Sequence, residues 1–187
     1  MRISRFLATT ASIVLLVPPL AARADGQAPP MPKPGPEHEV LKLEQGVWNA
    51  VVEFSPEPGK PATRSKGVET NTIACGGLCL VTDFKGELAP GMAFEGHGIA
   101  TWDAARKKYV GTWMDSMSST LSTSEATFDA AAKRMNGSME APDMTGKIAR
   151  MRSTTDLKDG QRVFTMYSPG PDGKEVQVLR IVYTKQK

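Results

Sequence analysis

From Gly46 onward the chain alternates apolar and polar residues, a pattern typical of β-strands. In the first segment Trp48 and Val52 face one way, while Asn49 and Glu53 face the other. Glycine and proline interrupt the alternation at short, regular intervals, which indicates strands joined by tight turns. The pattern predicts strands at residues 47–54, 63–74, 78–85, 92–102, 108–115, 120–128, 134–140, 147–157, 162–168 and 175–185.

A short helix is predicted before the first strand, over Glu37–Gln45. Pro36 suits its first turn, Leu41 contributes to its apolar side, and Gly46 ends it. No further helix is predicted, so successive strands have no crossover connection and must pair antiparallel. Ten such strands hide their edges by closing. The expected fold is therefore all-β: an up-and-down antiparallel β-barrel of about ten strands with a short N-terminal helix.

The first 24 residues have the features of a secretory signal peptide. Arg2 and Arg5 precede the apolar stretch 6–20, and Ala22-Arg23-Ala24 places small residues where an export peptidase cuts. Cleavage near Ala24 predicts a periplasmic or secreted protein with no membrane span in its mature form; an uncleaved membrane helix is the alternative. Residues 25–36 contain five prolines and predict an extended tether. Residues 37–187 are then the barrel domain.

Removal of the signal peptide changes the charge balance. The full chain has 23 basic and 20 acidic residues, and Arg2, Arg5 and Arg23 all lie in the signal. The mature chain would be formally neutral. Nucleic-acid binding needs a surplus of positive charge, so no nucleic-acid partner is expected.

The start of the first strand resembles the calycin-type barrels, the lipocalins and fatty-acid-binding proteins. The resemblance rests on a short helix followed by Gly46-Val47-Trp48 and then by an antiparallel meander. It implies that Trp48 plugs the closed end of the barrel and that Lys185, on the last strand, covers the indole ring as a cation–π partner. The alternative is that Trp48 is an ordinary core residue.

A longer resemblance covers nearly all of the mature chain. The segments "MPKPGPEHEVL", "FEGHGIATWDAARKKYVGTWMDSMS" and "YSPGPDGKE" resemble a bacterial family known only as domain of unknown function fifteen-seventy-nine. The resemblance implies a barrel and carries no agreed activity. The cysteines that flank Gly76-Gly77 depart from the family pattern, so they imply no family-wide role for thiols.

Two cysteines are separated by three residues, Cys75-Gly-Gly-Leu-Cys79. On a straight strand their Cα atoms would lie about 13 Å apart, which is too far for a disulfide. They can pair if the chain reverses at Gly76-Gly77, and paired glycines favour such a turn. We expect a disulfide that clamps a hairpin; a redox couple is the alternative.

The interior of a ten-strand barrel should be wide enough to keep a cavity. Methionine and aromatic residues at inward positions would line it, because methionine adapts to irregular space. The predicted ligand-binding residues are Phe54, Phe84, Met92, Phe94, Trp113, Asp115, Met139, Met151, Phe164 and Met166.

Asp115 is the polar member of this set, and an inward carboxylate needs a partner. Its candidate partners are Ser118, Ser122, Thr123, Arg150 and Arg152. The functional interpretation is an anchor for a ligand at the barrel mouth. The alternative is a strand-end aspartate that caps the next turn.

No metal or cofactor is expected. The chain has two histidines, which gives a zinc site few ligands, and the last strand lacks the axial histidine of nitrobindin-like haem barrels. His97 is predicted to point outward. The sequence favours binding of a small hydrophobic or amphipathic molecule without catalysis. The alternatives are a periplasmic protein-interaction module, or an enzyme that uses Asp115 with a nearby arginine.

Overall fold

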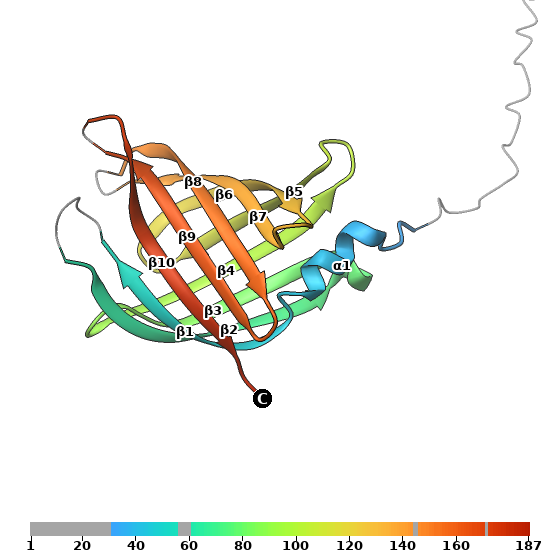
Figure 1. Ribbon diagram of the computed structural model, residues 1–187, viewed down its shortest axis with the longest axis horizontal. Coiled ribbons are helices and arrows are strands. Elements are labelled where there is room, and N and C mark those ends of the chain that lie inside the picture. Colours follow the sequence, from blue (N-terminus) through green and yellow to red (C-terminus); the bar gives the residue numbers. More distant parts are fainter. Residues whose placement is uncertain (1–30, 56–60, 144–145, 171) are drawn as a thin grey trace, which may run out of the picture. The chain divides into compact units, whose positions relative to one another are not determined.

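Ten antiparallel strands close into a barrel in the computed structural model, which describes residues 31–55, 61–143, 146–170 and 172–187 (Figure 1). Each strand pairs with its neighbours in sequence, and the first pairs with the last. The elements are α1 (Pro36–Lys42), β1 (Gly46–Phe54), β2 (Thr63–Ala74), β3 (Cys79–Ala89), β4 (Met92–Asp103), β5 (Lys108–Asp115), β6 (Ser118–Asp129), β7 (Arg134–Pro142), β8 (Ile148–Lys158), β9 (Gln161–Pro169) and β10 (Glu175–Lys185).

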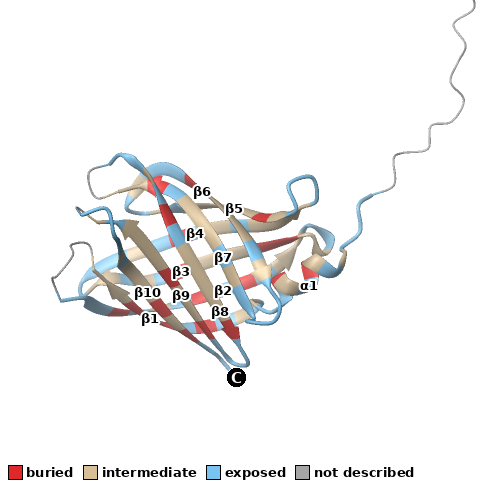
Figure 2. Ribbon diagram, turned by 45° about the horizontal axis from the view of Figure 1, so that its top comes forward, coloured by how far each residue is buried: buried red, intermediate tan, exposed pale blue. Residues whose placement is uncertain are grey.

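The predicted fold class is confirmed: an all-β, closed, up-and-down barrel with one short helix before β1. Buried and exposed residues alternate along the strands, as the hydrophobic pattern requires (Figure 2). The helix ends at Lys42, earlier than predicted. The predicted signal peptide, residues 1–24, and the first part of the tether lie outside the described residues. No helix in the described part of the chain is long and apolar enough to cross a bilayer.

The two sides of the barrel interior differ in composition. On β1, β3 and β10, Ala50, Val52, Phe84 and Ile181 belong to one buried cluster, and partly buried rings such as Phe164 pack against it. The opposite wall, strands β6 to β8, presents small and polar residues to the interior together with Met135, Met139 and Met151. By strand register the small and polar residues are Ser122, Ser124, Ala126, Gly137, Ala141, Ala149, Ser153 and Thr155.

Two glycines of β4 make room for a tryptophan of β5. A Cβ atom on Gly96 would lie 2.1 Å from Cζ2 of Trp113, and one on Gly98 would lie 3.0 Å from Cε3. The indole therefore lies directly over the bare backbone of its neighbouring strand.

Helix α1 packs at one end of the barrel (Figure 1). Leu41 joins Leu80 and Tyr109 in a second buried cluster. The Tyr109 hydroxyl donates a hydrogen bond of 2.9 Å to the Glu37 carbonyl, and His38 Nδ1 accepts one of 3.0 Å from the Gly35 amide. The histidine thus caps its own helix. We call this the helix end of the barrel, and the opposite end, where β4 begins and β5 ends, the mouth.

Candidate functional site

The predicted ligand-binding residues lie inside the barrel with one exception. Phe84 and Met151 are buried, and Phe54, Phe94, Trp113, Asp115, Met139, Phe164 and Met166 are partly buried. The exception is Met92. It is 45% exposed at the start of β4, beside the β3–β4 turn at the mouth of the barrel.

Some inward-facing rings are only partly buried. Phe94 and Trp113 pack against the buried cluster and keep part of their surface accessible, although both side chains face the interior. The Phe84 and Phe94 rings meet edge to face, with centroids 5.7 Å apart. Partly buried aromatic rings therefore line the interior beside the buried cluster.

Asp115 stands at the mouth end of β5 and its carboxylate is occupied by its own neighbours. The Trp113 indole Nε1 donates to Oδ2 at 2.9 Å, and the Met117 amide donates to Oδ1 at 2.9 Å. The second bond is the turn cap that was the alternative to a ligand anchor. In the described residues, none of the five side chains proposed from the sequence as partners hydrogen-bonds to the Asp115 carboxylate.

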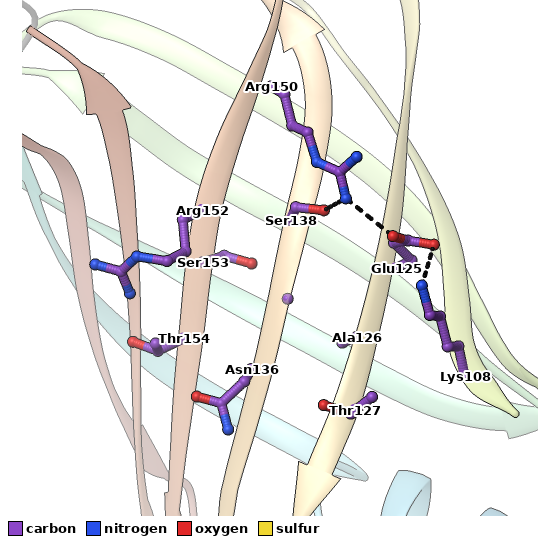
Figure 3. A pocket seen from close by; sticks show the side chains of 11 residues that line it. Lys108, Glu125, Ala126, Thr127, Asn136, Ser138, Arg150, Arg152, Ser153 and Thr154 are labelled. Atoms are coloured by element: carbon purple, nitrogen blue, oxygen red, sulfur yellow. Dashed lines mark hydrogen bonds and ion pairs between the residues drawn. The ribbon is translucent and has the colours of Figure 1, made fainter. Parts of the chain in front are cut away.

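The two arginines proposed as partners lie on the outer wall instead, beside a shallow hollow of about 330 Å³ over β6 to β8 (Figure 3). Arg150 donates to Glu125 at 3.0 Å and to Ser138 at 2.9 Å. Lys108 approaches the same carboxylate at 2.9 Å, and its hydrogen bond is the largest of the effects that lower the pKa of Glu125. Arg152 pairs with a carboxylate of β10. Arg150 and Arg152 point outward because they flank Met151 on β8, and Met151 faces the interior.

At the helix end, Trp48 is only 2% exposed and Lys185 lies over its ring, with Nζ 5.3 Å from the centroid. The contact expected between these two residues is present. A second cation was missed by the sequence reasoning. Arg162 of β9 is 4% exposed, and its guanidinium lies 5.0 Å from the Trp48 ring and 4.0 Å from the Tyr183 ring. Two basic side chains thus lie against the Trp48 ring.

Arg162 is neutralised by two carboxylates from distant parts of the chain. Its NH1 contacts Glu44 at 2.5 Å, and its NH2 donates to Glu69, which also accepts from Asn71 at 2.8 Å. Burial by itself lowers the pKa of Arg162, but Glu44 and Glu69 outweigh that effect and raise it above its ordinary value. Burial also raises the pKa of Tyr183 well above its usual value, and Glu69 adds to the shift.

A signal for this network was present in the alternation. Arg162 shares its face with Phe164 and Met166, so the same rule that put those residues inside put a guanidinium there too. A buried charge requires a partner, and Glu69 faces inward by the register of β2 with Trp48.

Cys75 and Cys79 form a disulfide, with Cα atoms 5.6 Å apart. The chain reverses at Gly76 and Gly77, whose φ values are +66° and +96°, as predicted. His97 points outward and its Nδ1 lies 2.6 Å from Asp83 Oδ1. Among the described residues, no group of three histidine, cysteine or acidic side chains is placed to hold a metal ion.

The family described as "Protein of unknown function (DUF1579)" matches residues 33–185. Among solved structures, the crystal structure of Rv2717c from M. tuberculosis is similar over 82% of this chain and 99% of that chain, with 10% identity and a TM-score of 0.62. A redesigned beta barrel covers 79% of this chain and 96% of its own at 13% identity, with a TM-score of 0.42 that is too low to support an argument. No curated protein matches the chain. At 10% identity, the likeness to Rv2717c shows the fold alone.

Proposed function

The chain belongs to the DUF1579 family of proteins of unknown function, and we propose that it binds a small apolar or amphipathic molecule inside the barrel without catalysis. The observation that carries the proposal is the partial burial of aromatic rings that face the barrel interior. Phe94, Trp113 and Phe164 face inward and still keep accessible surface. A guest that covered these rings would add apolar burial.

The difference between the two interior walls favours an amphipathic guest. The rings of β4, β5 and β9 would contact its apolar part. The wall of β6 to β8 supplies hydroxyl groups, among them Ser124 and Ser153, and Met139 and Met151 on the same wall adapt to the shape of the guest. A polar group at one end of the guest is therefore compatible with this interior.

A catalytic role for Asp115 has less support. Its hydrogen bonds go to Trp113 and Met117, and neither of the two arginines that were its candidate partners contacts it. A carboxylate held in this way fixes the tryptophan and the turn.

We also propose export to the periplasm or outside the cell, which the Cys75–Cys79 disulfide supports because disulfides persist in oxidising compartments. The Trp48–Lys185 contact similarly supports a relationship to calycin-type barrels.

Native mass spectrometry tests the binding proposal. The protein is incubated with fatty acids, isoprenoids and porphyrins, and bound mass is recorded. Two neighbouring substitutions on β6 locate the guest: Ser124→Phe fills the interior, whereas Thr123→Phe adds the same ring to the exposed outer face. We expect Thr123→Phe to keep the bound mass and Ser124→Phe to lose it while remaining folded. Equal binding by both variants would reject an interior site.

A further inference from the structure

A second hollow, of about 500 Å³, lies at the helix end of the barrel. It opens between the end of α1, the β6–β7 turn, the β8–β9 turn and the end of β10. Its lining residues are Lys42, Leu43, Trp48, Phe128, Ala130, Lys133, Leu157, Lys158, Asp159, Gly160, Gln161, Arg162 and Lys185. None of the ten predicted interior residues belongs to it. The hollow is thus a separate candidate site.

Positive charge is concentrated around this hollow. Five of its lining residues are cationic and one, Asp159, is acidic. Two of the five, Arg162 and Lys42, pair with carboxylates that do not line the hollow. Lys133, Lys158 and Lys185 have no carboxylate partner in the described part of the chain. The surplus is local, because the chain as a whole has nearly as many acidic as basic residues. Charges of one sign gathered around a concave surface attract a ligand of the opposite sign.

The hollow also has apolar surface and a buried donor. Leu43, which is 50% exposed, and the partly buried Phe128 contribute the apolar surface. Arg162, which is 4% exposed, lines the same hollow, and its Nε has no hydrogen-bond acceptor among the described residues. Buried polar groups are usually paired, so an orphaned guanidinium nitrogen beside a hollow indicates a missing acceptor.

Backbone hydrogen bonds fix the elements that surround the hollow. The Leu157 amide donates to the Lys133 carbonyl at 2.8 Å, which joins β8 to the β6–β7 turn. The Lys185 amide donates to the Gly160 carbonyl at 3.0 Å, which joins β10 to the β8–β9 turn. The cationic side chains therefore project from backbone that is already held in place, and ligand binding would cost little backbone ordering.

We propose that this hollow binds an organic anion, a phosphate or carboxylate group attached to a flat apolar body. The anion would lie among Lys133, Lys158 and Lys185, and the apolar body would pack on Phe128 and Leu43. Such a group occurs in free small molecules and also in the headgroups of anionic lipids. The proposal is independent of the guest inside the barrel.

Calorimetric titration with 1-naphthyl phosphate tests the proposal, with 1-naphthol as the uncharged control. We expect the phosphate to bind, to weaken in 0.5 M NaCl, and to bind at least about tenfold more tightly than the naphthol. The variant Lys133→Glu/Lys158→Glu should weaken phosphate binding by about tenfold or more. The matched control, Lys66→Glu/Lys174→Glu, makes the same change in net charge on exposed lysines that do not line the hollow, and should change the affinity less than twofold.

Three outcomes would overturn the proposal: naphthol binding as tightly as the phosphate, no effect of salt on the unmodified protein, or equal losses in the two charge variants. If Ser124→Phe abolishes the binding of naphthyl phosphate, the anion lies in the barrel interior, and this result also overturns the proposal. Cosedimentation with phosphatidylglycerol and phosphatidylcholine vesicles separates the two sources. A lipid headgroup is identified if the protein binds phosphatidylglycerol vesicles but not phosphatidylcholine vesicles, and if Lys133→Glu/Lys158→Glu abolishes that binding. A free anion is identified if the protein binds naphthyl phosphate but neither kind of vesicle.

Discussion

Replacing Arg162 with methionine tests the buried charge network at the helix end. Methionine keeps much of the side-chain volume and removes the guanidinium. The change leaves Glu69, which is 5% exposed, without its cation, and it removes the stacking on Trp48 and Tyr183. Glu44 is more exposed and can be solvated, so Glu69 accounts for most of the penalty.

The expected loss of stability follows from that geometry. Removing one partner of a buried ion pair costs about 3–5 kcal/mol, so we expect Arg162→Met to lower the free energy of unfolding by about 4 kcal/mol. The corresponding fall in Tm is roughly 10 °C for a protein of this size. The matched control is Arg64→Met, which breaks an ion pair with Glu53 whose arginine is 76% exposed. That change should cost less than about 1 kcal/mol.

Urea unfolding at pH 7, followed by circular dichroism, measures both variants. The double variant Arg162→Met/Glu69→Gln should recover at least half of the loss, because it removes the stranded charge. The reasoning is refuted if Arg162→Met is no less stable than Arg64→Met. It is also refuted if the added Glu69→Gln change makes the protein still less stable.

Three further predictions concern other parts of the barrel. Gly96→Ala places a Cβ atom 2.1 Å from the Trp113 ring and should lower the free energy of unfolding by about 2 kcal/mol. It should also alter the near-ultraviolet circular dichroism of the indole, and an unchanged spectrum would contradict the contact. Reducing the Cys75–Cys79 disulfide opens a short loop and should cost about 2 kcal/mol in urea unfolding, whereas no change on reduction would show that it contributes nothing to stability. Burial raises the pKa of Tyr183, so this side chain keeps its proton in the folded state. Its contribution to the free energy of unfolding is therefore complete below pH 10 and is lost as pH rises further. Tyr183→Phe should therefore flatten the fall in stability above pH 10, and an equal slope in both proteins would contradict this assignment.

Local patterns were sufficient to predict most of the barrel. Alternation defines a strand wherever one face is buried, and the glycine pair between the cysteines fixes a reversal that depends on adjacent residues alone. The position of Trp48 against Lys185 also follows from strand order, because closing the barrel places the first strand beside the last.

Features that depend on long-range contacts or on turns were not predictable in the same way. Arg162 meets Glu44 and Glu69 across 118 and 93 residues of sequence, and the alternation showed only that it faces inward. Asp115 was given distant partners, but its side chain turns back to its own strand and the next turn. Met92 is exposed at the first position of β4, and periodicity does not reveal how far the end of a strand projects into solvent.

Methionine-methyl NMR tests the central claim most directly, because the chain carries methionines both inside the barrel and outside it. The protein is labelled with ¹³C at the methionine methyl groups and titrated with laurate. An interior guest predicts shift changes for Met139, Met151 and Met166, and unchanged signals for Met114 and Met117, which are exposed. If bound laurate instead shifts only the exposed methionines, the guest lies on the outer surface and the account of a guest-binding interior is wrong.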